Sequence, residues 1–308
     1  MLHQRSFRAM NTDVGVWLWS HHPQASEAVA AIPAFFEEVE QELSRFRPAS
    51  ALCRLNAGAG GGPQTVSVIL TEVVRLAIDK ARDTGGLFDP TILPALQVAG
   101  YDAPFPEVAA RAATTERAQP AAPRTAGPRW QDIGFSGSAI VLPAGTAIDL
   151  GGIAKGWAVD RAAERLRALG SVMVDAGGDI RCTGTVEGRR WPIAVADPMT
   201  AGRSLAILEL ADEAVATSSI GRRRWQQGGK WMHHLIDPRT QRPAATDLHT
   251  VTVLGPRALE CEIHTKVVLL LGSEAGAAHL DSRRLSGLLV LQDGAVRVVG
   301  ERMARSRQ

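Results

Sequence analysis

The segment from Thr146 to Gly170 constrains the fold of this chain more than any other. A short apolar run at 146–150 is typical of a strand, and two glycines at 151–152 end it. Apolar residues then recur at helical spacing over 154–169, with Gly170 as the expected residue after the helix end. The segment therefore predicts a strand, a glycine turn and a helix in direct succession.

This turn has the chemistry of a diphosphate-binding site. Glycine lets the backbone approach a ligand closely, a helix N-terminus offers free N–H groups to an anion, and Lys155 adds a cation. The spacing matches neither the P-loop nor the Rossmann dinucleotide-binding pattern. An ordinary strand-to-helix turn with a surface lysine is the alternative.

Periodicity predicts the remaining elements. Helices are expected at 27–45 and 71–82, the second with Thr71 as N-cap and Gly85 and Gly86 as its stop. Strands are expected at 14–19, 139–142, 172–174, 191–196, 204–210, 248–254 and 288–298. Because helices alternate irregularly with strands, we predict an α+β (mixed α/β) fold, with a mostly antiparallel or mixed sheet core flanked by helices.

The composition favours one globular domain. With 45% hydrophobic residues over 308 positions the chain can bury a full core, and no Gly/Ser linker divides it. We predict a single compact domain over 1–308. A stretch rich in Ala, Pro, Arg and Thr at 103–128 is expected to be a mobile surface excursion, and 301–308 to be a basic tail.

Charge and cysteine usage exclude several classes of protein. A formal net charge of +2 is too small for a polyanion-binding field, so no nucleic-acid partner is predicted. Cys53, Cys182 and Cys261 lie far apart and form no Cys-x-x-Cys pair, which fits a reducing compartment. No apolar run is long enough to span a bilayer. These features predict a cytoplasmic protein that does not span a membrane.

A second candidate for chemistry is the segment 233–240, which reads HHLIDPRT. The imidazole of His234 can take a hydroxyl proton near neutral pH, and the carboxylate of Asp237 can orient it. A hydrogen-bonded histidine pair at a strand end is the alternative.

Four linked motifs carry a resemblance. They are DLGGIAKGWAVD at 149–160, DAGGDIRCTG at 175–184, HLIDPRT at 234–240 and GLFDPT at 86–91. Taken together in their order along the chain, they resemble the FAD:protein FMN transferase family, the ApbE type, over most of the chain. The resemblance implies transfer of FMN from FAD to a Thr or Ser hydroxyl of an acceptor flavoprotein as a phosphoester, with AMP released and Mg²⁺ required.

The resemblance also implies site residues. His234, Lys155 and Asp237 are the implied catalytic residues, with His234 activating the acceptor hydroxyl. The implied FAD contacts are Met10, Phe46, Leu87, Phe88, Asp89, Gly151, Trp157 and Leu235. Trp157 and Phe88 are equally compatible with places in the apolar core.

The implied metal site departs from the family pattern, in which an Asp precedes a Thr by four residues. Here Thr265 is retained, Cys261 stands in the place of the Asp, and Glu262 follows it. A thiol is a poor ligand for Mg²⁺. Three interpretations stay open. Glu262 reaches the ion; or Thr265, the Ala154 carbonyl, water and FAD phosphates hold it; or Lys266 replaces its charge.

Other readings of the chain remain. If His264 and Cys261 faced the same site, Zn²⁺ would become possible. An FAD pyrophosphatase, in which water replaces the acceptor hydroxyl and the products are FMN and AMP, would have a nearly identical site. A non-catalytic FAD-binding protein would follow if the altered metal site had lost activity.

Overall fold

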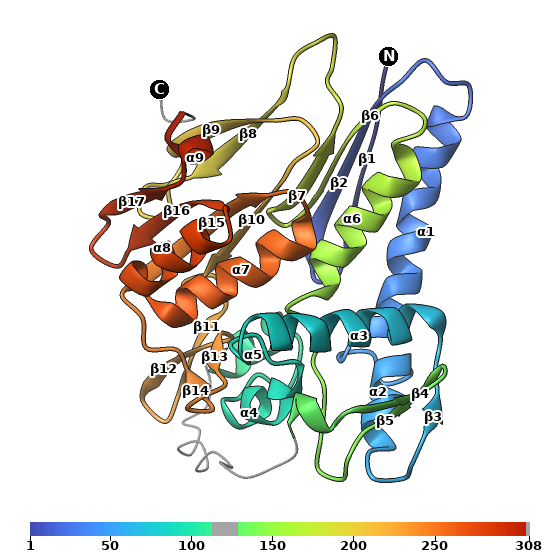
Figure 1. Ribbon diagram of the computed structural model, residues 1–308, viewed down its shortest axis with the longest axis vertical. Coiled ribbons are helices and arrows are strands. Elements are labelled where there is room, and N and C mark those ends of the chain that lie inside the picture. Colours follow the sequence, from blue (N-terminus) through green and yellow to red (C-terminus); the bar gives the residue numbers. More distant parts are fainter. Residues whose placement is uncertain (113–128, 306–308) are drawn as a thin grey trace. The chain divides into compact units, whose positions relative to one another are not determined.

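The computed structural model describes residues 1–112 and 129–305 (Figure 1). Residue contacts divide the chain into two compact units. The first unit comprises Met1–Glu38, Ile153–Ser218 and Thr246–Gln308, and the second comprises Val39–Gly152 and Ser219–Ala245. That the whole chain forms one domain stays a prediction. No helix among the described residues is long and apolar enough to cross a membrane.

An eight-stranded sheet forms the centre of the first unit, in the order β1-β2-β6-β7-β10-β15-β16-β17. Strand neighbours from β1 through to β10, and from β15 through to β17, pair antiparallel. The strands are β1 (Leu2–Ala9), β2 (Thr12–Trp19), β6 (Ser171–Ala176), β7 (Asp179–Thr183), β10 (Ala214–Ser219), β15 (Leu248–Gly255), β16 (Ser286–Leu291) and β17 (Val296–Val299). The predicted α+β class with a largely antiparallel sheet is confirmed.

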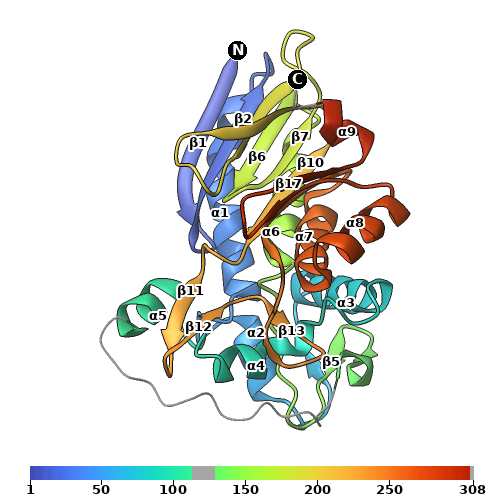
Figure 2. The same cartoon turned by 90° about the vertical axis from the view of Figure 1, so that its left-hand side faces the viewer.

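Helices and a hairpin cover the two faces of this sheet. The helices α6 (Ala154–Leu166), α7 (Ala258–Leu271) and α8 (Ser273–Ser282) pack on one face (Figure 2). The hairpin of β8 (Trp191–Ala196) and β9 (Ser204–Leu210) alternates buried and exposed residues, and its buried side chains join an apolar cluster with β7 and β16. The unit also contains the first part of α1 (Ala25–Leu43), and α9 (Glu301–Arg305).

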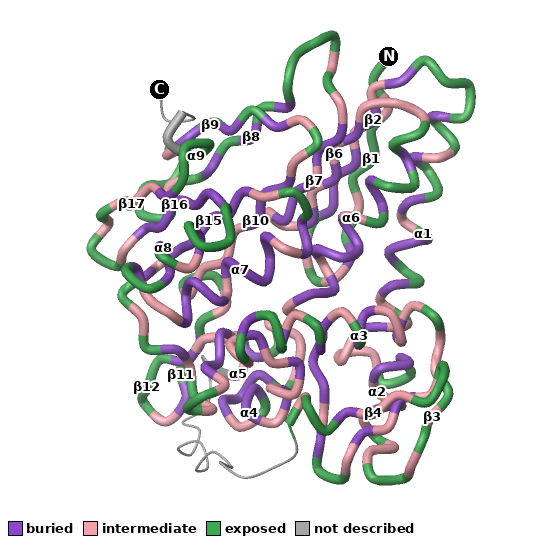
Figure 3. The backbone as a smooth tube through the Cα atoms, in the orientation of Figure 1, coloured by how far each residue is buried: buried purple, intermediate pink, exposed green. Residues whose placement is uncertain are grey.

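Helix α7 is buried around most of its circumference (Figure 3). It contacts β15, α6 and α8, so apolar residues occur on all its faces rather than in one stripe. Three of its buried residues are nevertheless polar: Glu262, His264 and Thr265. Buried polar groups need partners, and this helix therefore places chemistry inside the first unit.

Gly156 lets α6 and α7 approach closely. A Cβ atom built at this position would lie 2.7 Å from both the Cα and the N of Leu259. We expect Gly156→Ala to lower the free energy of unfolding by about 1–3 kcal/mol, because the overpacking exceeds the gain in helix propensity. Denaturant unfolding measures the change. Gly134→Ala is the control, since its Cβ would make an ordinary 3.5 Å contact with Val141. Unchanged or higher stability of Gly156→Ala would contradict the close packing.

The second unit is built from short elements. Its strands are β3 (Gln64–Thr65), β4 (Gly134–Ser136), β5 (Ala139–Val141), β11 (Arg224–Gln227), β12 (Lys230–His233), β13 (Ile236–Asp237) and β14 (Arg242–Pro243). Its helices are α2 (Ala51–Ala57), α3 (Val68–Asp83), α4 (Leu93–Val98) and α5 (Phe105–Ala112), with 3₁₀ turns η1 (Pro90–Ile92) and η2 (Trp130–Asp132). Trp225, whose indole N–H donates to the Ala99 carbonyl at 2.9 Å, joins α4, α5 and β12 in one apolar cluster.

Two predicted elements of the second unit are wrong. Residues 146–150 are not a strand, because the Asn56 side chain and the Pro90 carbonyl, rather than a neighbouring strand, pair with the backbone at Ile148 and Asp149. Thr71 is not the cap of α3. Ser67 caps it by accepting from the Leu70 N–H, and Thr71 lies one turn inside.

Two further predictions need correction. The helix α6 ends at Leu166, and Gly170 is needed for another reason: a Cβ there would lie 2.2 Å from the Trp19 carbonyl oxygen. The excursion predicted at 103–128 begins with helix α5, whose Val108 is buried. The remainder of that excursion, 113–128, and the end of the basic tail, 306–308, lie outside the described residues.

Candidate active site

Each of the helices α6 and α7 provides a carboxylate that caps the N-terminal end of the other. Helix α6 begins after Ile153, which makes no side-chain cap, and the Gly156 N–H instead donates to Glu262 Oε2 of α7 at 2.8 Å. In return Asp160 of α6 accepts from the Ala258 and Leu259 N–H groups of α7, at 2.9 and 3.1 Å. Carboxylates at helix N-termini are favourable, since the helix dipole is positive there. These hydrogen bonds join the two helices near the N-terminus of α6, which the predicted diphosphate-binding turn precedes in the sequence.

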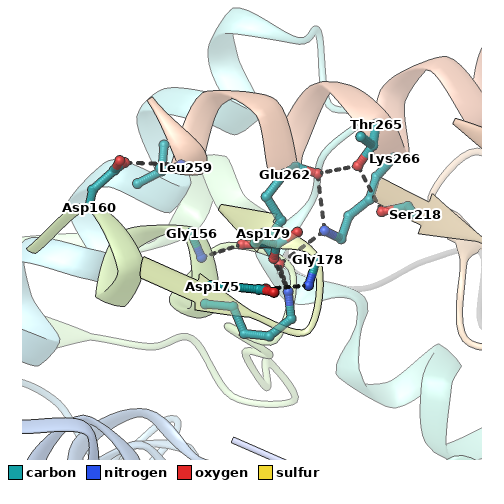
Figure 4. Close-up of polar contacts among 11 residues, drawn as sticks. Gly156, Asp160, Asp175, Gly178, Asp179, Ser218, Leu259, Glu262, Thr265 and Lys266 are labelled. Atoms are coloured by element: carbon teal, nitrogen blue, oxygen red, sulfur yellow. Dashed lines mark hydrogen bonds and ion pairs between the residues drawn. The ribbon is translucent and has the colours of Figure 1, made fainter. Parts of the chain in front are cut away.

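Two lysines and two carboxylates gather at this end (Figure 4). Lys155 of α6 pairs with Asp179, the first residue of β7, and with Glu262 Oε1 at 3.0 Å. Lys266, one turn along α7, donates to the same Glu262 oxygen at 3.2 Å and to the Glu262 carbonyl at 3.1 Å. We call Lys155, Asp179, Glu262 and Lys266 the lysine–carboxylate cluster. It lies wholly in the first unit.

The electrostatics of the cluster are mutual. Burial disfavours the charged form of Lys155, but Asp179 and Glu262 outweigh burial and raise its pKa above the ordinary value. Burial would raise the pKa of Glu262, yet Lys155, Lys266 and the Gly156 N–H lower it to about 2. Burial raises the pKa of Asp179, with Lys155 opposing it. Burial lowers the pKa of Lys266, with Glu262 opposing it. Near neutral pH Lys155 and Glu262 are therefore ionised, and their opposite charges hold the cluster together.

Three other residues of α7 point to different partners. The Thr265 hydroxyl donates to the Glu262 carbonyl at 2.8 Å and lies 2.7 Å from the Ser218 hydroxyl. The Cys261 thiol donates to the Ala214 carbonyl at 3.5 Å, and burial raises its pKa well above the ordinary value. His264 Nδ1 lies 3.0 Å from His279 Nε2 on α8. Cys261 and His264 thus make separate contacts, and the Zn²⁺ reading gains no support.

The side chains present do not fit a Mg²⁺ ion in this arrangement. Mg²⁺ requires near-octahedral oxygen ligands, whereas Cys261 is a protonated thiol bonded to Ala214 and both Glu262 oxygens already accept from nitrogen donors. Among residues 1–112 and 129–305, no three His, Cys, Asp or Glu side chains are grouped to hold a metal ion. The roles of Ala154, Thr265, Glu262 and Cys261 as ligands stay predictions.

The glycine turn that precedes α6 is anchored in the second unit. Asp149 accepts from the Gly151 N–H and pairs with Arg45 Nε at 2.6 Å, with both side chains less than 10% exposed. The guanidinium of Arg45 also lies 4.0 Å from the Phe46 ring centroid and donates to the Tyr101 carbonyl at 2.9 Å. Asp149 therefore fixes the turn that the sequence assigned to diphosphate.

The other predicted FAD contacts are distributed over both units. Met10 lies in the β1–β2 turn with φ 51°, and Trp157 is buried against Phe35 at a centroid distance of 6.2 Å; both belong to the first unit. Phe46, Leu87, Phe88, Asp89, Gly151 and Leu235 belong to the second. The core environment suggested for Trp157 and Phe88 is observed, since both are more than nine-tenths buried. Their contacts with FAD stay predictions.

Asp89 is committed to local structure. Its Oδ1 accepts from the backbone N–H and the hydroxyl of Thr91, at 2.8 and 2.6 Å, which caps the 3₁₀ turn η1. Burial raises the pKa of its carboxyl. The FDPT motif thus combines a buried aromatic residue with a capped turn, and Asp89 stabilises that turn.

The predicted base and its partner lie in the second unit. His234 follows β12, and Asp237 ends β13. Both carboxylate oxygens of Asp237 accept from Arg239, at 2.8 Å to Nη2 and 2.9 Å to Nε, and the neighbouring His233 bonds the Ala244 carbonyl at 3.2 Å. Arg239 therefore holds the Asp237 carboxylate in a bidentate ion pair. The role of Asp237 in orienting His234 stays a prediction.

Sequence reasoning missed three residues that organise the site. Asp179 lies in the motif at 175–184 but had no assigned role, Asp160 caps α7, and Asp149 anchors the glycine turn. Asp149 and Asp179 stand beside glycine turns, which was the available signal, whereas Asp160 lies in the middle of α6. The partner of Asp179 is 24 positions away and the Ala258 partner of Asp160 is 98 positions away, so no local pattern reveals these pairings.

The fold is that of solved ApbE-type flavin transferases. The ApbE protein of Thermotoga maritima has a TM-score of 0.87 at 23% identity, with 100% of both chains covered. The flavin transferase ApbE of Vibrio cholerae has a TM-score of 0.79 at 25% identity, with 99% of both chains covered.

Membership follows from the sequence itself. The ApbE family model matches residues 10–289, so this chain belongs to the ApbE family. The FAD:protein FMN transferase of Treponema pallidum is 29% identical over 316 residues, covering 96% of this chain and 86% of the relative. That of Vibrio cholerae is 31% identical over 265 residues, covering 85% and 78%. The resemblance found from the four motifs is confirmed.

Proposed function

We propose that this chain cleaves FAD and attaches the FMN half to a Thr or Ser hydroxyl of an acceptor flavoprotein as a phosphoester, with release of AMP. The observation that carries the proposal is the family match over residues 10–289, together with relatives named FAD:protein FMN transferase. The three free cysteines, Cys53, Cys182 and Cys261, support a reducing compartment, and we propose that the transfer takes place in the cytoplasm.

The chemistry places few demands on the enzyme's own side chains. The acceptor hydroxyl is the nucleophile, and it attacks the phosphorus on the FMN side of the diphosphate while AMP leaves. Positioning and neutralisation of the phosphate charge supply most of the catalysis. In our proposal Lys155 neutralises charge at the start of α6, where Glu262 and Asp179 hold its ammonium in place.

His234 is the proposed base for the acceptor hydroxyl. An imidazole has the right basicity near neutral pH, and removal of a positioned base reduces rate by about 10²–10⁴-fold. Asp237, rigid in its bidentate pair with Arg239, is the proposed positioning residue of the same segment. Met10, Phe46, Leu87, Phe88, Asp89, Gly151, Trp157 and Leu235 are the proposed FAD contacts.

The function is tested by the mass of an acceptor. The purified protein is mixed with FAD and an acceptor domain that the Vibrio cholerae flavin transferase modifies under the same conditions. We expect the mass of each acceptor molecule to increase by that of one FMN attached as a phosphoester. An acceptor whose target Thr is replaced by Val is the control, and it should stay unmodified. An unmodified wild-type acceptor, with the Vibrio cholerae enzyme active beside it, would contradict the proposal.

A further inference from the structure

The position on α7 where the family pattern expects an aspartate has lost its carboxylate. Cys261 stands there, four residues before Thr265, and its thiol is completely buried and bonded to the Ala214 carbonyl of β10. Gly255 packs on the same sulfur, since a Cβ at that glycine would lie 3.1 Å from it. The residue therefore fills a core position between helix and sheet and presents no oxygen ligand.

Glu262, the next residue, is already saturated. Its Oε1 accepts from Lys155 at 3.0 Å and from Lys266 at 3.2 Å, and its Oε2 accepts from the Gly156 N–H at 2.8 Å. Its backbone carbonyl accepts from Lys266 at 3.1 Å and from the Thr265 hydroxyl at 2.8 Å. A divalent ion would have to displace two ammonium groups to reach these oxygens.

Displacement is opposed by charge. The two ammonium groups and the two carboxylates are mostly buried, with Lys155 and Lys266 side chains only 18% and 17% exposed. In such surroundings a cation placed beside two ammonium groups meets strong repulsion. The displaced Lys266 ammonium would lose the Glu262 carboxylate, and Lys155 would keep Asp179 alone. The two lysines are thus the cations at the N-terminal end of α6, with Glu262 and Asp179 as their counter-ions, and the predicted diphosphate-binding turn precedes this helix in the sequence.

We propose that the ammonium group of Lys266 takes the place of a divalent metal ion, so that this chain neutralises the diphosphate of its flavin substrate with Lys155 and Lys266 and binds no metal in the lysine–carboxylate cluster. The part concerning the flavin diphosphate rests on the proposed function. The part concerning metal rests on the cluster alone. The position of Lys266, four residues after Glu262 on one face of α7, makes it the specific replacement.

The test measures metal binding directly. Mn²⁺ serves as a paramagnetic probe, and the free ion is quantified by electron paramagnetic resonance during titration of the full chain, with and without FAD. We expect no stoichiometric Mn²⁺ on the wild type in either case. The double variant Cys261→Asp/Lys266→Ala restores the carboxylate and removes the ammonium, and we expect it to bind one Mn²⁺ per chain, at least tenfold more tightly. Lys230→Ala, which removes an exposed lysine of β12, is the control and should behave as the wild type.

The outcomes separate this inference from the proposed function. One Mn²⁺ per wild-type chain, lost in Glu262→Gln and unchanged in Lys266→Met, would overturn the inference whether or not FMN is transferred. This result needs no variant with a new metal site to fold. No Mn²⁺ on the wild type, with transfer rates equal in chelator and in added Mg²⁺, would support the whole proposal. No transfer in any condition, with Mn²⁺ bound only by the double variant, would support the metal part and overturn the diphosphate part.

Discussion

Replacement of Glu262 by glutamine should lower the free energy of unfolding by about 3–5 kcal/mol, since it leaves the buried Lys266 without its carboxylate partner and Lys155 with Asp179 alone. Glu262 is 1% exposed and caps α6 through Gly156, so the loss affects both helices. Denaturant unfolding at neutral pH measures the change. The variant Glu262→Gln/Lys266→Met should recover part of the loss, because it also removes the lysine that has lost its carboxylate partner.

A matched control separates burial from charge. Glu274 on α8 pairs with Arg297 but is 86% exposed, so Glu274→Gln should change stability by less than about 1 kcal/mol. Equal effects of the two substitutions would show that the lysine–carboxylate cluster is no more than a surface ion pair, and the packing described for α6 and α7 would be wrong.

The effect of Glu262→Gln on the free energy of unfolding should also depend on pH. The pKa of Glu262 is lowered from 4.5 to about 2 in the folded chain, so its stabilising contribution is fully present above about pH 4.5 and is lost as the pH falls towards 2. The contribution is about 3 kcal/mol from a shift of this size. Asp179 acts in the opposite direction, because its raised pKa makes its contribution decline as pH rises from about 4 to about 6. The stability difference between wild type and Glu262→Gln should therefore shrink below pH 4.5, and a constant difference would contradict the assignment.

The second large effect is expected at His234. His234→Ala should reduce the rate of FMN transfer by about 10²–10⁴-fold, because the acceptor hydroxyl loses its base. The rate is measured in a single turnover, from the mass of the acceptor against time. FAD affinity, followed by flavin fluorescence, should change by no more than about threefold, since the imidazole acts on the acceptor. A transfer rate within tenfold of the wild type would remove His234 from the mechanism.

His233 offers the control next in sequence. Its Nδ1 accepts from the Leu235 N–H at 3.3 Å and its Nε2 lies 3.2 Å from the Ala244 carbonyl, so both ring nitrogens are used by the backbone. Burial lowers its pKa and keeps it neutral. His233→Ala should therefore reduce stability while folded molecules keep a transfer rate within about tenfold of the wild type. A rate loss as large as that of His234→Ala would mean that the whole segment, rather than one imidazole, is responsible.

The local sequence patterns predicted the presence of helices and strands more accurately than the residues at which they begin and end. The strands β8 and β9 alternate cleanly and match their predicted ranges, because one face of each is buried. Helix α3 begins a turn before the predicted residue, since Ser67 and Thr71 are both competent caps and only the fold decides between them. The run at 146–150 looked like a strand, but a side chain 92 positions away, Asn56, pairs with its backbone.

The candidate site was predictable in part. Motifs brought Lys155, Glu262 and Thr265 to notice, and the structure joins all three in one network. The pairing of Glu262 with Lys155 and Gly156 spans more than 100 positions, and the role of Asp179 depends on how β7 meets α6. Neither can be read from spacing. The substitution of Cys261 pointed to a changed metal site, whereas the partners that now occupy Glu262 required the packed helices.

The most direct test of the central claim is the product balance of a single reaction. FAD, the acceptor and the protein are incubated together, and AMP, free FMN and acceptor-bound FMN are quantified from the same sample. Transfer predicts AMP and acceptor-bound FMN in a one-to-one ratio with little free FMN. AMP matched by free FMN would identify a pyrophosphatase instead, and intact FAD with no AMP, beside an active Vibrio cholerae enzyme, would identify a binding protein; either result would contradict the account.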